Sequence, residues 1–195
     1  MKKVIFLSLI ALAISSVSFA QNSKSFYRSS YESRNSGSWS SNHSILSLGY
    51  GFANQFYPGG PYGNRFSLGP VYVKYEHGFL RDEVGLGGTI ALAHAWVKAP
   101  NDVKYNVTAF SIAALGYYHF NKLIPVDALD VYAGLGLSFW SRSGDTNVYY
   151  NYSDSNVYPV AKVGARYYVK PSFGFYGEVG YDQMSSLNLG VTFKF

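Results

Sequence analysis

Apolar and polar residues alternate along most of the chain from position 44 to position 195. The last segment is the clearest, because every second residue from Leu187 to Phe195 is apolar and the residues between them are small or polar. A period of two is typical of a β-strand with one apolar and one polar face. The alternation is weaker in the first, third and fourth segments. We expect eight strands, at residues 44–53, 71–79, 84–97, 105–120, 129–139, 157–169, 173–182 and 187–195.

The connections between these segments fall into long and short classes, which is typical of an up-and-down membrane barrel. Long polar loops are expected at 53–68, 98–104 and 141–156. Tight turns are expected at Arg81-Asp82 and at 170–172, with a short loop at 183–185 and an intermediate link at 121–128. We therefore predict an all-β, eight-stranded antiparallel transmembrane β-barrel, with the long loops outside the cell and both chain ends in the periplasm.

Composition supports a membrane barrel over a soluble one. Aromatic residues make up 18% of the chain and charged residues only 14%, whereas soluble domains carry about 25% charged residues. Mean hydropathy is nevertheless −0.03, because lipid-facing and lumen-facing residues alternate and cancel. Aromatic residues gather near both ends of the expected strands, as interfacial girdles do. A lipocalin-like soluble barrel is disfavoured, since it would not end on Phe193-Lys194-Phe195.

The first twenty residues predict a cleavable secretory signal. Lys2 and Lys3 precede an apolar run at 4–14, and small residues flank Phe19 at Ser18 and Ala20. The run is too short for a membrane-spanning helix, so we expect cleavage after Ala20. The predicted organisation is a signal peptide at 1–20, a polar Ser-rich extension at 21–43 and an outer-membrane barrel at 44–195. The extension is interpreted as a linker, with a plug folded into the lumen as the alternative.

Several charged residues fall on the face opposite the apolar one and are expected to point into the lumen. An eight-stranded barrel has an interior only wide enough for its own side chains. We therefore predict a packed polar core, with a narrow pore as the alternative, built from Lys74, Glu76, Asp130, Lys162, Arg166 and Glu178. We expect the strands at 157–169 and 173–182 to pair with their even-numbered residues facing inward, in a register whose paired residue numbers sum to 342 or 344. Glu178 should then pair with Lys162 or Arg166.

The final residues resemble the terminal signal that the barrel-assembly machinery recognises in outer-membrane proteins, through Asn188, Gly190, Phe193 and Phe195. Over residues 44–195 the chain resembles the small outer-membrane β-barrel family that includes OmpX and the transmembrane domain of OmpA. The resemblance implies outer-membrane lipid, lipopolysaccharide and the assembly machinery as partners. It also implies roles in envelope integrity, surface contact or narrow-pore diffusion, without choosing among them.

No constellation in the sequence favours catalysis, a cofactor or a metal. Cysteine is absent, and none of the four histidines forms a close metal-binding pair. A barrel deacylase would need Ser and His together on one outward face with an acid to orient the His, whereas His43 and Ser44 point to opposite faces. The signal removes Lys2 and Lys3, which lowers the net charge from +5 to +3, too little to predict nucleic-acid binding.

The loop expected at 141–156 is the best candidate contact surface, because Tyr149, Tyr150 and Tyr152 offer contact area at low entropic cost. Three functions follow. The first is a non-enzymatic barrel with a filled polar lumen that serves envelope integrity or surface interaction through its outer loops. The second is a narrow channel for small solutes or ions. The third, least favoured, is an enzyme acting on envelope lipid.

Overall fold

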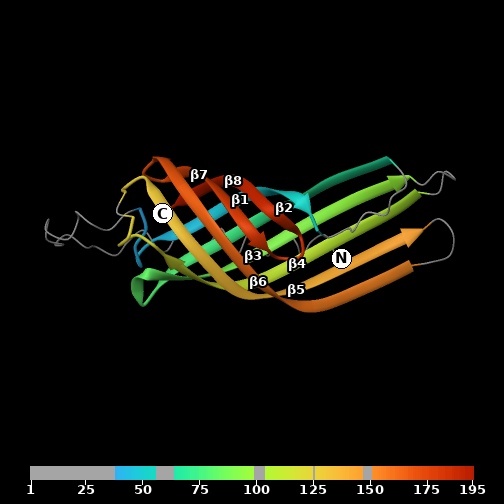
Figure 1. Cartoon of the computed structure of the whole chain (residues 1–195), viewed down its shortest axis with the longest axis horizontal. Coiled ribbons are helices and arrows are strands. Elements are labelled where there is room, and N and C mark those ends of the chain that lie inside the picture. The colour runs from blue at the N-terminus through green and yellow to red at the C-terminus, as the bar shows by residue number, and fades with distance from the viewer. Residues whose placement is uncertain (1–37, 56–63, 99–103, 125, 147–150) are drawn as a thin grey trace, which may run out of the picture. The chain divides into compact units, whose positions relative to one another are not determined.

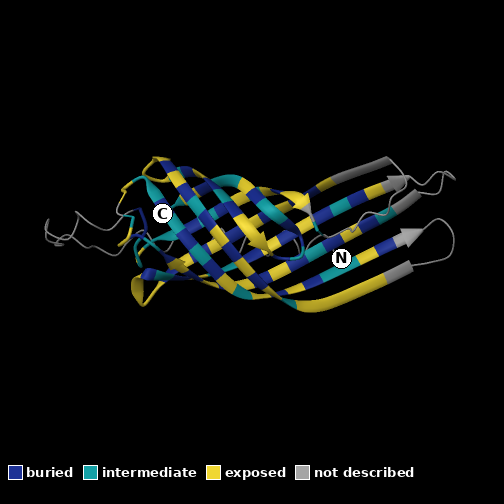
Figure 2. Ribbon diagram, viewed as in Figure 1, coloured by how far each residue is buried: buried dark blue, intermediate teal, exposed yellow. Residues whose placement is uncertain are grey.

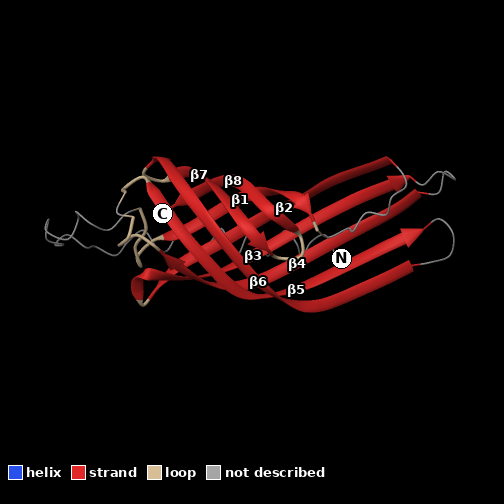
Figure 3. Ribbon diagram, in the orientation of Figure 1, coloured by secondary structure: helices blue, strands red, loops and turns tan. Residues whose placement is uncertain are grey.

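The computed structural model describes residues 38–55, 64–98, 104–124, 126–146 and 151–195. These residues form a closed barrel in which each strand pairs antiparallel with its neighbours in chain order, and β1 pairs with β8. The predicted eight-stranded up-and-down barrel is confirmed. The described part of the chain contains no helix long and apolar enough to span a membrane (Figure 3). The strands are β1 (Ser44–Asn54), β2 (Asn64–Phe79), β3 (Arg81–Lys98), β4 (Lys104–His119), β5 (Leu129–Thr146), β6 (Asn151–Lys170), β7 (Phe173–Tyr181) and β8 (Ser185–Lys194).

The strands differ in length, and this difference defines the two ends of the barrel. We call the end where β1 begins and β8 ends the terminal rim; there Ser44 and Phe195 exchange two backbone hydrogen bonds of 2.8 and 3.0 Å. β1, β7 and β8 have 11, 9 and 10 residues, whereas β2 to β6 have 16 to 20. At the opposite end the longer strands therefore continue past the shorter ones as a sheet, which we call the distal sheet (Figure 1).

Two of the predicted loops are shorter than expected. β2 begins at Asn64, and β5 and β6 continue to Thr146 and from Asn151, so parts of 53–68 and 141–156 are strand. Within the second of these regions Arg142 pairs with Asp154. The alternation of apolar and polar residues is lost there because the residues are polar on both faces. Backbone pairing does not need that alternation, so the strands run on beyond their apolar section.

The outer face of the barrel is apolar, and charged and hydroxyl side chains line much of its interior. Buried and exposed residues alternate along the strands, as Figure 2 shows. Outward positions include the exposed Leu48, Val73, Ile90, Leu137 and Val163. Inward positions include many buried charged and hydroxyl side chains. This polarity is the reverse of that of a soluble barrel and fits a protein whose outer surface contacts lipid.

Candidate functional site: the polar interior and the terminal rim

The six charged residues that the sequence places in the lumen are all buried inside the barrel. They come from β2, β5, β6 and β7, and they form two groups around the ring of Tyr132. The structure adds two ionisable members that the sequence did not single out, His119 at the end of β4 and Asp182 just after β7. Strand alternation could have found both, since His119 falls on the inward face with Tyr117 and Asp182 on the inward face with Glu178, although β7 ends one residue before Asp182.

The first group joins Arg166 and His119 to the same two carboxylates. Arg166 contacts Glu76 through Nη2 and Asp130 through Nη1, the latter at 2.8 Å. The ring of His119 lies 2.7 Å from Asp130 through Nδ1 and 2.6 Å from Glu76 through Nε2. With both carboxylates ionised they only accept hydrogen bonds, and both ring nitrogens of His119 then donate, which is the hydrogen-bond pattern of a doubly protonated imidazole. Two positive and two negative charges then cancel within the group.

The second group is built around Glu178, which accepts hydrogen bonds from Lys74 and, at 2.8 Å, from the hydroxyl of Tyr132. Lys162 lies between Glu178 at 3.5 Å and Asp182 at 2.6 Å. This group also contains two positive and two negative side chains. Tyr132 links the groups, because the Arg166 guanidinium lies 4.0 Å from the centroid of its ring.

Asp182 shows how such a group keeps a buried carboxylate charged. Burial raises the pKa of its carboxyl, but the Lys162 charge and hydrogen bonds from Lys162 and from the backbone N–H groups of Ser185 and Met184 outweigh burial, so the pKa lies below its usual value. The hydroxyl of Tyr72 donates a further bond of 2.9 Å to Asp182. The turn between β7 and β8 is thereby tied to the lumen.

The register between β6 and β7 agrees with one of the two predicted alternatives. Gly164 faces Glu178, so the paired numbers sum to 342, and Lys162 reaches Glu178 diagonally. The alternative partner Arg166 was wrong, because its guanidinium is taken by Glu76 and Asp130. Lys74, the principal partner of Glu178, lies on β2. Pairing between adjacent strands carries no information about contacts across the lumen.

The described end of the N-terminal extension, residues 38–43, closes the terminal end of the interior; we call it the N-terminal clamp. Trp39 is 1% exposed and stacks on His119, with ring centroids 3.9 Å apart and planes at 8°. The side chain of Asn121 donates a hydrogen bond of 3.0 Å to the Trp39 carbonyl oxygen, and the Lys194 ammonium donates one of 2.7 Å to the Ser38 carbonyl oxygen. For these residues the plug alternative fits better than a linker.

One glycine makes room for the clamp. An added Cβ at Gly78 would lie 2.3 Å from the carbonyl oxygen of Ser41, closer than a real Cβ contact allows. Ser41 is held from the other side, where its backbone N–H and its hydroxyl donate to Asp82 at 3.0 and 2.6 Å.

Two hydroxyl–imidazole pairs lie on the outward face. Ser44 and His77 are directly opposite on β1 and β2, with Oγ 2.8 Å from Nδ1, and Thr108 and His94 make a similar pair on β4 and β3. A catalytic pair needs a third group that orients the histidine. Within the described residues, no carboxylate hydrogen-bonds His77 or His94. We therefore interpret these contacts as structural hydrogen bonds between polar side chains of paired strands.

The residues proposed as an assembly signal lie at the end of β8. Asn188 is buried and accepts 2.9 Å from the hydroxyl of Tyr176. An added Cβ at Gly190 would lie 2.0 Å from the Leu48 carbonyl oxygen, so only glycine fits there. Phe193 and Phe195 are exposed on the outer face. Of the three tyrosines proposed as a contact surface, Tyr149 and Tyr150 fall outside the described residues, and Tyr152 pairs through its backbone with Gly144.

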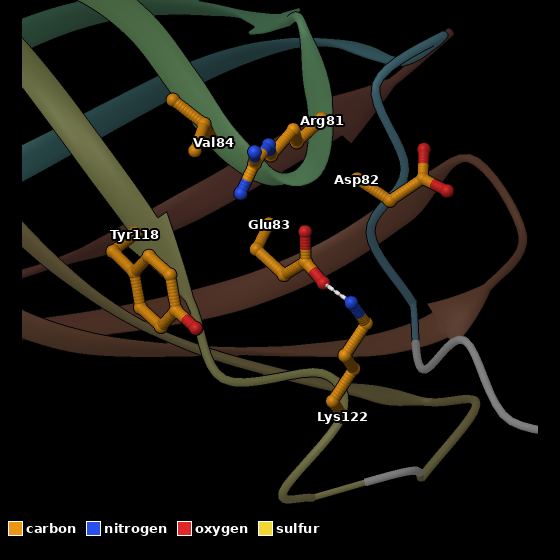
Figure 4. A pocket seen from close by; sticks show the side chains of 6 residues that line it. All are labelled: Arg81, Asp82, Glu83, Val84, Tyr118 and Lys122. Carbon is orange, nitrogen blue, oxygen red and sulfur yellow. Dashed lines mark ion pairs between the residues drawn. The ribbon is translucent and has the colours of Figure 1, made fainter.

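The terminal rim also carries a pocket of about 490 Å³ between the β2–β3 turn and the β4–β5 connection. Figure 4 shows its six lining side chains and the ion pair between Glu83 and Lys122. The hydrogen bond from Lys122 to Glu83 raises the pKa of the Lys122 ammonium. The lining residues are Arg81, Asp82, Glu83, Val84, Tyr118 and Lys122.

This barrel has the fold of small outer-membrane β-barrel proteins. The outer membrane protein OprG from Pseudomonas aeruginosa matches it with a TM-score of 0.57 at 13% identity, over 82% of this chain and 98% of that one. The attachment invasion locus protein Ail of Yersinia pestis matches with a TM-score of 0.49 at 16% identity, over 78% and 96%. The N-terminal β-barrel domain of Pseudomonas aeruginosa OprF matches with 0.41 at 19%, over 78% and 96%.

Comparisons at the level of sequence add no relative. No protein-family description matches the chain, and no curated protein matches it. At these low identities the structural similarity establishes the fold, and function has to be argued from the residues.

Proposed function

We propose that this protein is a non-enzymatic outer-membrane barrel with a closed, side-chain-filled interior, which supports the envelope and presents its distal sheet for surface contact. The observation that carries the proposal is the paired interior. Every ionisable side chain of the two lumen groups contacts a group of opposite charge, and all of them are buried. A water-filled channel would leave its lining charges hydrated.

The N-terminal clamp supports closure from one end. Trp39 covers His119 and packs with Ile45 and Tyr168 in a buried cluster. The ammonium of Lys194 lies 4.3 Å from the Tyr168 ring centroid, beside the same cluster. An ion that entered at the terminal rim would have to displace this cluster and then separate the Arg166 and His119 pairs.

Single-channel recording tests the closed interior against the narrow channel. We expect the full mature chain in a planar bilayer to give no discrete conductance steps, with insertion verified by protease protection in proteoliposomes. A porin inserted under the same conditions serves as the positive control. Regular steps from correctly inserted barrels would favour the channel.

The distal sheet is the proposed contact surface. Pairing between β6 and β7 stops at Ala161 and Tyr181, so among the described strands β6 has a free edge beyond that point. Ser153, Asp154, Ser155 and Asn156 are exposed there. Tyr149, Tyr150 and Tyr152 are proposed to contribute aromatic contacts, and a variant with serine at all three should weaken adhesion of expressing cells to coated surfaces. Equal adhesion would remove the tyrosines from the proposal.

We also propose export through cleavage after Ala20, periplasmic chain ends, and assembly through Asn188, Gly190, Phe193 and Phe195. Outer-membrane lipid and lipopolysaccharide would then surround the barrel. Deleting Phe195 should lower the yield of folded barrel, read by the heat-dependent gel shift, more than deleting residues 21–37. The second deletion leaves the N-terminal clamp intact, so similar losses in both would count against the assembly signal.

A further inference from the structure

The pocket at the terminal rim contains charged groups that the fold does not use fully. Asp82 accepts both hydrogen bonds from Ser41, and Glu83 is paired with Lys122. Arg81, by contrast, forms no ion pair with any residue that the structure describes. Among the residues that the structure describes, the pocket groups without a partner are therefore donors, the Arg81 guanidinium and the Tyr118 hydroxyl. Figure 4 shows both side chains beside the Glu83–Lys122 pair.

The surroundings of the pocket place it at the level of lipid headgroups. Leu80 in the β2–β3 turn is 84% exposed, and Leu123 beside Lys122 is 76% exposed. Leaving such side chains in water is unfavourable, whereas the bilayer interface accepts them. Tyr118 packs edge-on against Phe120 with ring centroids 5.3 Å apart, and an aromatic pair with a polar tip is common at that depth. The pocket therefore opens where phosphate groups are concentrated.

We propose that this pocket binds the headgroup of a zwitterionic phospholipid. The phosphate accepts hydrogen bonds from Arg81 and Tyr118, because a guanidinium matches two phosphate oxygens at once. The ammonium lies near the carboxylates of Asp82 and Glu83, whose negative charges attract it. The pocket has two positive and two negative side chains, so a headgroup with both charges suits it better than an anionic one. The inference goes beyond the proposed function and requires only that the terminal rim lies in a membrane interface.

Native mass spectrometry of the full mature barrel, titrated with phosphatidylethanolamine in detergent, tests the site. We expect Arg81→Ala to weaken binding about tenfold, as the loss of a charge-assisted contact does. Tyr118→Phe, which removes only the hydroxyl, should weaken it less. Lys170→Ala is the matched control, since Lys170 is an exposed cation near the same rim but outside the pocket, and should bind like the native chain. The heat-dependent gel shift verifies that each variant is folded.

Two further ligands distinguish the sources of the phosphate group. Phosphatidylglycerol should bind more weakly than phosphatidylethanolamine, and inorganic phosphate in excess should displace neither. Equal losses in Arg81→Ala and Lys170→Ala would overturn the proposal, because any rim cation would then serve. Tighter binding of phosphatidylglycerol would overturn the zwitterionic assignment, and displacement by inorganic phosphate would show a site for the free ion. Single-channel conductance does not depend on lipid binding in this pocket. Failure of the closed-interior proposal can therefore be told apart from failure of the headgroup proposal.

Discussion

Two clusters fill the same interior with opposite chemistry. The charged groups around Tyr132 consist of paired ions, whereas a second cluster, which we call the alanine cluster, is apolar. It is formed by Tyr72, Ala91, Ala93, Ala95, Val107, Ala109, Trp140 and Met184. Both are buried to a similar degree. The inside of a narrow membrane barrel must therefore be filled, but it need not be polar throughout.

The clusters should respond differently to substitution. In the charged groups, removing one ionic side chain leaves its partner charges buried and unpaired. The loss of stability then comes from uncompensated charge. In the alanine cluster no ion is lost, and the expected cost of a larger side chain comes from overfilling a packed interior. Unfolding in urea, with the protein in lipid vesicles, measures both on one scale.

The largest effect is expected for Arg166→Met, which keeps an unbranched apolar stem and removes the charged guanidinium. Glu76 and Asp130 would then share only His119, and breaking a buried pair in this way costs about 3–5 kcal/mol. The free energy of unfolding should fall by that amount, whereas Lys170→Ala on the exposed rim should change it little.

A combined variant sharpens the same test. If the cost comes from unpaired charge, Arg166→Met together with Glu76→Gln should recover part of the lost stability, since Asp130 then remains paired with His119 and no carboxylate is left over. A double variant less stable than Arg166→Met alone would show that packing or hydrogen-bond geometry, and not charge, dominates this group.

An intermediate effect is expected for Ala109→Leu in the alanine cluster. Ala109 is fully buried, and overfilling a packed interior costs about 1–3 kcal/mol. Ala114→Leu is the matched control, because Ala114 lies on the same strand but faces outward and is exposed. If the two variants unfold at the same urea concentration, the region around Ala109 contains unfilled space and the interior is not closed at that level.

The same comparison explains which parts of the fold could be predicted from the sequence. Strands with charged residues on one face, such as β6 with Lys162 and Arg166, showed clear alternation. The third and fourth segments alternated weakly because their inward residues include Ala93, Ala95 and Ala109, which differ little in polarity from the outward leucines. Strand number and order were nevertheless predictable, since turn spacing and the remaining strands fixed them.

For the lumen site, the sequence predicts only which side chains point inward, from the alternation of inward and outward positions along each strand. Parity indicated that Lys74 and Glu178 point inward, but their contact across the lumen depends on barrel closure. Trp39 was beyond reach for a different reason, because the segment around it has no periodicity. Its stacking on His119 follows from the three-dimensional fit at the rim, which no local pattern encodes.

The smallest expected effect is on stability in acid, and it tests the charged groups at one residue, Asp182. The carboxyl of Asp182 has a pKa below its usual 3.8 in the folded protein. A group with a lowered folded pKa contributes stability above its unfolded pKa, and this stability is lost as the pH falls through the folded value. Stability should therefore decline as the pH falls below about 4, and Asp182→Asn should decline less steeply over that interval. Because Asp182 is one carboxyl among several that titrate, the decline of unfolding free energy with pH should differ only modestly between the native protein and Asp182→Asn.

Asp154→Asn, at an exposed position in β6, should show the same decline with pH as the native protein. Identical slopes for the native protein and Asp182→Asn would mean that Lys162 does not stabilise this carboxylate, and the turn between β7 and β8 would then be held to the lumen by the Tyr72 and backbone hydrogen bonds alone.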